Sequence, residues 1–177
     1  MVGRQKKKSA PGLLLVLLLL FITLNAFSQK GRTAKINNLY SCLLEYKIEC
    51  PKTVLAIAVY ETGWMECKNC SYQYNNLFGF RSNRNYVRFK NIYECIEYLK
   101  VWQETYYDPW KARHPRGSYY DFLVHIRYAR SSMSNYLKTI KSVERLVSKN
   151  VKDMDATIIP DIEPGLELQL DTVTDVK

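Results

Sequence analysis

The sequence is poor in the residues that build metal centres. It has two histidines, His114 and His125, among 177 residues. Its one Cys-x-x-Cys pair, Cys67 and Cys70, has no second pair to complete a four-ligand zinc site. Because a zinc ion is held by three or four such side chains, the sequence does not favour a metal site. We therefore expect no metal and no other cofactor.

The chain also lacks an apolar run long enough to cross a bilayer. Leu13–Leu24 spans about a dozen residues, against the ~20 that a membrane helix needs. Arg4 and Lys6–Lys8 precede this run, and Ala26-Phe27-Ser28 follows it with small residues suited to cleavage. No cysteine comes directly after the run, which argues against a lipoprotein anchor. We predict a signal peptide over residues 1–28, with an uncleaved N-terminal anchor as the alternative.

This prediction places the mature protein outside the cytoplasm, secreted or periplasmic in the cell envelope, with no stable membrane span after cleavage. Acidic residues are in the minority, and the net charge is +9. Residues 29–150 carry +10 and residues 151–177 carry −5. A basic exported domain is expected to meet an anionic polymer or surface. Export argues against nucleic acid, so a cell wall or another acidic glycan fits better as the partner.

Five cysteines follow the predicted signal peptide: Cys42, Cys50, Cys67, Cys70 and Cys95. An oxidising compartment permits disulfides, and the odd count leaves at least one thiol unpaired or intermolecular. The Cys67–Cys70 spacing is that of a redox motif or half a zinc knuckle. A disulfide that ties the loop, or plain small hydrophobic residues, fits better than either.

Apolar periodicity predicts one mostly helical domain over residues 29–150. The helix expected over residues 51–62 opens with Pro51 and closes before Gly63, and it is apolar nearly all round, so it should be central and buried. Residues 77–90 predict a short β-hairpin that turns at Ser82–Asn85. The other expected helices cover residues 33–47, 91–107, 118 to about 129 and about 134 onward, with a polar loop over 108–117.

From about residue 151 the pattern dissolves into an acidic tail, which composition predicts to be disordered. The alternation of Leu166, Leu168 and Leu170 with polar residues leaves a short added strand as an alternative. The architecture expected is therefore a helical bundle lobe with one short hairpin. A cleft between the two is the natural place for a site.

Glu61 is the residue on which a function depends. It lies in the last turn of the predicted helix 51–62, where the negative end of the helix dipole disfavours a charged carboxylate. Trp64, Phe78 and Phe80 are near in sequence and offer apolar walls, which also disfavour the charge. Both effects raise the pKa. A carboxyl group protonated near neutral pH is what a general acid for glycosidic cleavage requires; a helix-end glutamate that reaches solvent or a lysine is the alternative.

Four segments resemble glycoside hydrolase family 73, the exported peptidoglycan endo-β-N-acetylglucosaminidases. They are "VLAIAVYETGWMEC" (54–67), "NNLFGFR" (75–81), "FKNIYECIEYLKVW" (89–102) and "IRYARSSMSNYLKTI" (126–140), in the family's order. The resemblance covers roughly residues 33–148. It implies a lysozyme-like α+β fold and a monomeric enzyme that cleaves β-1,4 bonds after N-acetylglucosamine in peptidoglycan glycan strands, and so remodels the cell wall.

The resemblance also assigns roles to single residues. Glu61 takes the place of the catalytic acid, and Tyr128 that of a tyrosine near the reacting sugar. The motif formed by Asn75, Asn76, Phe78 and Gly79 takes the place of the segment that binds sugar and shapes the cleft. Trp64 either packs beneath Glu61 or stacks on a sugar ring, and Tyr136 is expected to pack.

The sequence departs from the family in two places. Residues 79–93 hold no acid, so the second carboxylate that many members carry near the hairpin is missing, and Glu66 and Glu94 are the nearest acids in sequence. Arg130-Ser131-Ser132 also stands where the family has an aspartate. Assistance by the substrate's own acetamido group, with Tyr128 helping, would need only one protein carboxylate.

The hairpin is basic, with Arg81, Arg84 and Arg88. These arginines either keep an exposed strand edge soluble or face an anionic glycan such as peptidoglycan; we favour the second interpretation and count Arg81 among the substrate-binding residues. Three alternative functions stay open: a lytic transglycosylase, a non-catalytic peptidoglycan-binding protein with a degenerate site, and a structural envelope protein that docks through its tail.

Overall fold

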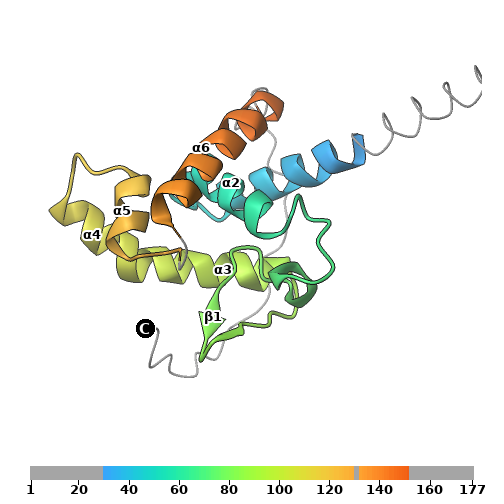
Figure 1. Ribbon diagram of the computed structural model, residues 1–177, viewed down its shortest axis with the longest axis horizontal. Coiled ribbons are helices and arrows are strands. Elements are labelled where there is room, and N and C mark those ends of the chain that lie inside the picture. The colour runs from blue at the N-terminus through green and yellow to red at the C-terminus, as the bar shows by residue number, and fades with distance from the viewer. Residues whose placement is uncertain (1–29, 130–131, 152–177) are drawn as a thin grey trace, which may run out of the picture.

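The computed structural model describes residues 30–129 and 132–151. The predicted signal peptide and residues 152–177 of the predicted tail lie outside these ranges. The described chain is mostly helical with one small antiparallel sheet, as the sequence predicts. Figure 1 shows the helices as one cluster with the hairpin, labelled at β1, drawn below α3. Among the described residues, no helix has the length and apolarity that a membrane crossing needs.

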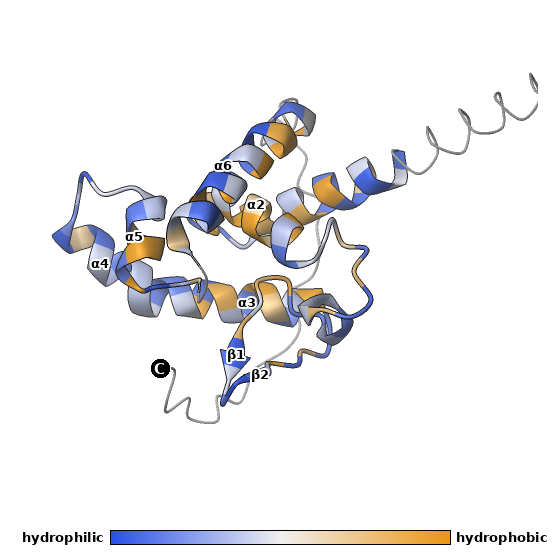
Figure 2. Ribbon diagram, viewed as in Figure 1, coloured by the Kyte–Doolittle hydropathy of each residue, from blue (hydrophilic) through white to orange (hydrophobic). Residues whose placement is uncertain are grey.

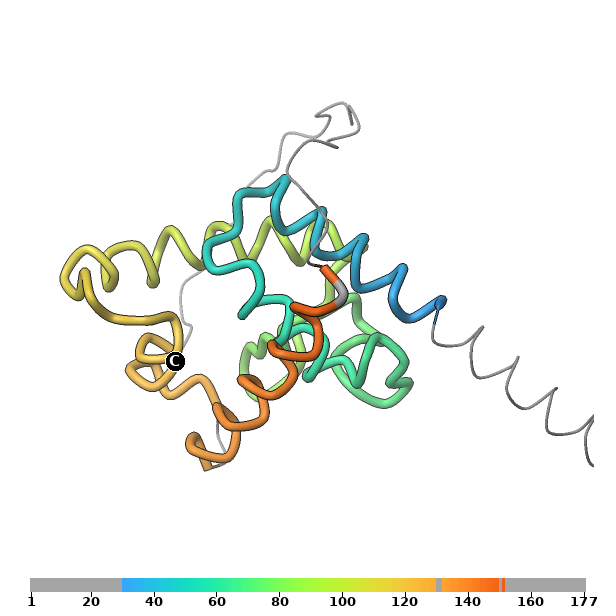
Figure 3. The backbone as a smooth tube through the Cα atoms, turned by 90° about the horizontal axis from the view of Figure 1, so that it is seen from above, coloured from blue at the N-terminus to red at the C-terminus, as the bar shows by residue number. Residues whose placement is uncertain are grey.

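Helix α2 (Pro51–Glu61) is the centre of the core. Seven of its residues, Thr53–Val59, are buried in succession, so every face of the helix meets protein. Its main partner is α6 (Met133–Asn150), and the two run side by side in Figure 3. The α6 side chains that enter the core, Tyr136, Ile140, Val143 and Val147, repeat at three- and four-residue spacing. Both helices match the sequence prediction.

The first described helix covers residues 30–45 and contributes Ile36, Leu39, Tyr40 and Leu43 to the core. On the other side of the core lies α3 (Ile92–Trp102), which buries Cys95, Ile96 and Leu99. Asn91 caps α3 by accepting from the backbone N–H of Glu94 at 2.9 Å, and Glu94 in turn accepts from the backbone N–H of Lys90. Glu94 thus reaches back to Lys90, one residue before the N-cap, whereas in the standard capping box it would bond the N–H of the N-cap itself.

The polar loop predicted over residues 108–117 is wrong in its first half. The chain continues from α3 through a π-helical turn (Gln103–Tyr107) directly into α4 (Asp108–Arg113). Pro109 lacks a backbone N–H and its ring clashes with the preceding turn of a regular helix. The wider π turn just before it lets the helical path continue, and burial of Trp110 favours this path over a loop.

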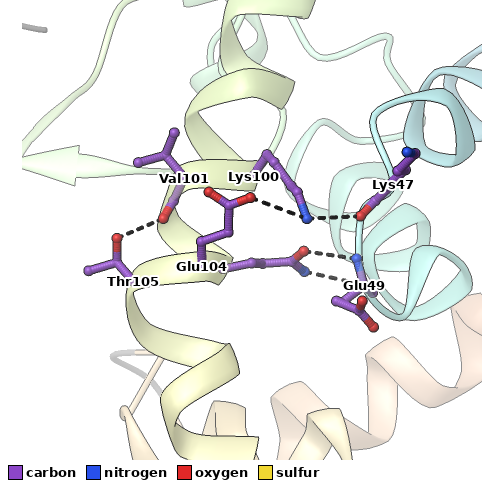
Figure 4. A network of polar contacts seen from close by, with 7 residues as sticks. Lys47, Glu49, Lys100, Val101, Glu104 and Thr105 are labelled. Atoms are coloured by element: carbon purple, nitrogen blue, oxygen red, sulfur yellow. Dashed lines mark hydrogen bonds and ion pairs between the residues drawn. The ribbon is translucent and has the colours of Figure 1, made fainter.

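Gln103, at the start of the π turn, fastens it to the loop before α2. Its amide oxygen accepts from the backbone N–H of Glu49 at 2.9 Å, and its amide nitrogen donates to the Glu49 carbonyl at 3.1 Å and to the Tyr119 hydroxyl at 3.1 Å. Lys100 adds a bond to the Lys47 carbonyl at 3.2 Å, seen beside Glu49 in Figure 4. Gln103 is fully buried, so its amide satisfies backbone groups that would otherwise lack partners.

Helix α5 (Tyr119–His125) starts where the sequence predicts and ends sooner. Ser118 and Asp121 form a complete capping box. The helix was expected to reach about Ala129 but ends at His125, because Arg127 adopts a left-handed conformation with φ 51°. The resulting turn aims residues 126–129 toward α6 and places them beside the pocket described below.

The predicted hairpin is confirmed, with very short strands. β1 (Arg81–Ser82) pairs with β2 (Asn85–Tyr86), Arg81 opposite Tyr86 and Ser82 opposite Asn85. Asn83 and Arg84 both have positive φ, 48° and 71°, which is the geometry of a type I′ turn. Figure 2 shows the strands in hydrophilic colours, in contrast to the orange of α2.

Candidate active site

A pocket of about 780 Å³ lies where α2 ends, between the hairpin, α3 and the start of α6. Its volume falls within the ~300–1,000 Å³ of typical small-ligand sites. Glu61 lines it and is the only carboxylate to do so among the described residues. Most of the wall is aromatic, formed by Tyr60, Phe78, Phe80, Tyr86, Tyr98, Trp102, Tyr106, Tyr128 and Tyr136.

The position of Glu61 follows from how α2 ends. Glu61 is the last residue of the helix, and the chain then turns through Gly63, Trp64 and Met65, all with φ between 53° and 62°. Thr62 holds this turn, since its hydroxyl donates to the Ala58 carbonyl at 2.6 Å and accepts from the Met65 N–H at 3.0 Å. The turn carries the following chain away and leaves the Glu61 carboxyl facing the pocket.

The environment of Glu61 favours its protonated form. Burial raises the pKa of this carboxyl above its ordinary value, while the Tyr136 hydroxyl and the positive charge of Arg81 act in the opposite direction. Tyr136 donates to Glu61 Oε1 at 3.2 Å. Burial and the nearby carboxylate raise the pKa of the Tyr136 phenol, so it keeps its proton and remains a donor. The direction of the Glu61 shift is the one that the sequence predicts.

Gly79 lies directly against the Glu61 carboxyl. A Cβ at position 79 would meet Glu61 Oε2 at 2.9 Å and its carboxyl carbon at 3.3 Å. The backbone at Gly79 has φ +68°, which a residue with a side chain rarely adopts. Both the close approach and the backbone geometry therefore require glycine here. The "NNLFG" motif meets the "ETGW" motif at this contact.

The two asparagines of that motif are structural rather than exposed to a ligand. The Asn76 side chain is fully buried, donates to the carbonyls of Phe80 and Val87 at 2.8 and 3.0 Å, and accepts from the Phe80 N–H at 3.0 Å. Asn75 donates to the carbonyls of Phe89 and Lys90 at 2.9 and 3.1 Å. Neither lines the pocket. Their amides pair with backbone, so the prediction that they bind sugar is replaced by a role in holding the hairpin.

Of the other predicted residues, Phe78, Gly79 and Arg81 line the pocket and Trp64 does not. The Trp64 side chain lies against the core with the Arg32 guanidinium 5.6 Å from its ring centroid. It is placed there by its own left-handed backbone, and Phe78 and Phe80 supply the apolar wall instead. The stacking of Trp64 on a sugar is therefore not supported by its position.

Tyr128 and Tyr136 both reach the pocket, with different partners. The Tyr128 hydroxyl donates to the Phe78 carbonyl at 2.6 Å, and it is Tyr136 whose hydroxyl reaches Glu61. Tyr136 was expected only to pack, and it does pack, with its ring 5.5 Å from that of Tyr60. The signal for its second role is that it is the one residue with a polar tip in the apolar stripe of α6.

Neither candidate for a second carboxylate belongs to this site. Glu66 is exposed and pairs with Arg32, its Oε2 lying 2.8 Å from the guanidinium. Glu94 accepts from the backbone at the start of α3. Neither lines the pocket, so among the described residues Glu61 is the one carboxyl group at this site.

All five cysteines are free thiols in the structure. Of the two interpretations offered for Cys67 and Cys70, the disulfide is thus not formed in the structure, which leaves the alternative of small apolar residues. Cys95 is fully buried and accepts from the Leu77 N–H at 3.3 Å, and burial raises the pKa of its thiol to about 12. It behaves as a small core residue beneath the "NNLFG" segment. The described residues contain no cluster of three or more potential metal ligands.

Comparison with known proteins adds no relative: no family model, no curated protein and no solved structure matches the chain. The chemistry of the site has therefore to be argued from its own residues.

Proposed function

We propose that the protein is a glycoside hydrolase that cleaves β-1,4 bonds after N-acetylglucosamine in peptidoglycan, with Glu61 as the general acid. The observation that carries the proposal is the lone, partly buried carboxyl of Glu61 at the wall of an aromatic pocket. Aromatic side chains offer flat apolar faces that suit the C–H faces of sugar rings. The proposed export of the mature protein would bring it to this substrate.

The first step is proton transfer. Glu61, whose pKa burial raises in favour of the protonated form, gives its proton to the glycosidic oxygen as the bond between this oxygen and the anomeric carbon breaks. The carboxyl becomes a carboxylate, and the hydrogen bond from Tyr136 and the charge of Arg81 stabilise the anion that forms. The same two groups that oppose the pKa rise in the resting enzyme thus favour the transfer itself.

The second step needs a nucleophile at the anomeric carbon. Since Glu61 is the one carboxylate that lines the pocket among the described residues, we propose that the acetamido oxygen of the substrate attacks this carbon and forms a cyclic oxazolinium ion, which keeps the amide proton. Water then attacks the anomeric carbon and gives one proton to the Glu61 carboxylate, while the bond to the acetamido oxygen breaks, so the neutral amide and the acid are both restored. Tyr128, already donating to the Phe78 carbonyl, would steady the wall against which the acetamido group lies.

The test is digestion of purified peptidoglycan followed by mass spectrometry of the released fragments. The proposal expects new reducing ends on N-acetylglucosamine from the wild-type protein and none from Glu61→Gln. Fragments that end in an anhydro-muramic sugar would instead identify a lytic transglycosylase. That activity is the second candidate, because a site with one acid also suits it. Binding to sacculi without release of sugar by either protein would leave a glycan-binding protein.

A further inference from the structure

The outer face of the hairpin carries a second pocket, of about 430 Å³, that the proposed reaction does not use. Three arginines line it, Arg81, Arg84 and Arg88, together with Tyr74 and Tyr86. We call Arg81, Arg84 and Arg88 the arginine cluster. All three side chains are exposed, while the two tyrosines are partly buried beneath them.

The arginine cluster is ordered by stacking. The Arg81 guanidinium lies 3.9 Å from the ring centroid of Tyr86, and that of Arg88 lies 4.1 Å from the ring centroid of Tyr74. The two rings are 6.2 Å apart. Arg81 also donates to the Arg84 carbonyl at 2.9 Å. Stacking of this kind fixes the guanidinium plane, and the N–H groups at its edge that Arg81 does not use on Arg84 can still donate, so less order has to be gained on binding an anion.

Within the described residues, the arginine cluster forms no salt bridge, and the acid that its charge acts on is Glu61, through Arg81 in the first pocket. No Asp or Glu lines the second pocket, and the salt bridges present join Arg32 to Glu66 and Lys100 to Glu104. Arginines that only keep a strand edge soluble would not need to line a common pocket or to stack on aromatic rings. Three guanidinium groups that line one pocket without a salt-bridged acid match planar oxyanions, which they can bind in a bidentate manner.

Arg81 lines both the second pocket and the pocket that contains Glu61. Tyr86 also lines both, so the two pockets adjoin at the hairpin, on the side where a substituent of a sugar bound near Glu61 has room to extend over β1. We propose that the arginine cluster binds the carboxylates of the peptide attached to the glycan, and so makes peptide-bearing strands the preferred substrate over bare ones. This inference rests on the proposed function for the identity of the glycan.

The experiment measures binding without turnover, in the full chain carrying Glu61→Gln. Isothermal titration compares a glycan fragment of alternating N-acetylglucosamine and N-acetylmuramic acid that bears its peptides with the same fragment after enzymatic removal of the peptides. We expect about tenfold tighter binding of the peptide-bearing fragment, since a few exposed charge pairs together contribute on that order. This preference should fall as salt is raised, because exposed charges are screened. Equal affinities for the two fragments at low salt would by themselves overturn the inference.

The variant Arg84→Gln with Arg88→Gln, in the same background, should lose the preference. Its matched control is Arg113→Gln with Arg116→Gln, which removes two exposed charges near the end of α4. Neither residue lines the Glu61 pocket or the second pocket, so the control should keep the preference for the peptide-bearing fragment. An equal loss of the preference in the control would mean a general charge effect and contradict the inference. Equal weakening of the affinity for both fragments in the Arg84 and Arg88 variant would contradict it in the same way. Competition by inorganic phosphate but not by the free peptide would contradict it in favour of a phosphorylated polymer.

The two proposals fail in different ways. If wild-type protein releases no sugar but Glu61→Gln still prefers peptide-bearing strands, the hydrolase proposal falls and the binding site stands. If sugar is released while bare and peptide-bearing strands bind alike, the hydrolase proposal stands and the proposed role of the arginine cluster falls.

Discussion

Tyr136 donates its phenolic hydrogen to Glu61 Oε1 at 3.2 Å, joining the first turn of α6 to the last residue of α2. The two residues are 75 positions apart in the chain. The phenol stabilises the carboxylate form of Glu61 more than its protonated form. This contact therefore affects how readily Glu61 gives up its proton. It also ties the candidate acid to the helix pair that forms the centre of the core.

Replacing Tyr136 by Phe should shift the pH profile of activity. The hydrogen bond lowers the pKa of Glu61 against the rise caused by burial, so its loss should raise that pKa further. The alkaline limb of kcat/KM, where Glu61 loses the catalytic proton, should then move to higher pH. Arg81→Gln should move the limb in the same direction, because it removes a positive charge that also lowers this pKa. A limb that stays in place in both variants would mean that another group controls it.

Glu61→Gln should reduce glycan cleavage by roughly a hundredfold to ten-thousandfold, the usual contribution of a general acid. Glutamine keeps the shape of the side chain and its acceptor oxygen for Tyr136, so the fold should be unaffected. Glu66→Gln is the control, since Glu66 faces Arg32 and not the pocket. Release of reducing ends from purified peptidoglycan measures both, and comparable activity in the Glu61 variant would refute the assignment.

The same substitution should stabilise the protein at neutral pH. The folded-state pKa of Glu61 is raised, so in the wild-type protein the stability present below the unfolded-state pKa is lost as the pH rises through the folded-state pKa. Glutamine does not titrate. The unfolding midpoints in urea should therefore coincide well below the ordinary glutamate pKa of 4.5 and diverge as the pH rises, Glu61→Gln being the more stable. A wild type that gains on the variant with rising pH would show a depressed pKa instead.

Gly79→Ala should impair both folding and the site. The new Cβ would lie 2.9 Å from Glu61 Oε2, and the backbone would be held at φ +68°. The strain of a left-handed residue with a side chain is about 1–2 kcal/mol, and the carboxyl would have to move from its present place. Urea unfolding measures the first effect and cleavage the second. Gly31→Ala is the control, because a Cβ there meets nothing within 4 Å.

Asn76→Ala should destabilise the protein by more than a surface change, by about 1–3 kcal/mol for each buried backbone group left without a partner. The Asn76 amide serves Phe80 and Val87 on either side of the hairpin. If its role is structural, the loss should appear in unfolding experiments at every pH and in the absence of glycan. Normal stability with weakened glycan binding would return Asn76 to the ligand-binding residues.

Local patterns in the sequence were sufficient for much of the fold. Pro51 and Gly63 bracket α2, the capping residues Asn91 and Ser118 begin α3 and α5, and two turn residues with positive φ make the hairpin. Each of these signals acts within a few residues of the chain, so no knowledge of distant contacts is needed to interpret it. The continuation into α4 was missed because it depends on burial of Trp110 and on the π turn before Pro109.

The composition and order of residues by themselves determined that a carboxyl group would end a buried helix close to aromatic side chains. Only the tertiary structure decided which groups touch it. Tyr136 reaches Glu61, Asn76 turns to the hairpin backbone and Trp64 leaves the pocket because side-chain partners are chosen by how helices and loops pack across long stretches of chain. A sequence pattern fixes the face of an element on which a residue lies, while the neighbour that it meets there depends on elements that fold against it from elsewhere.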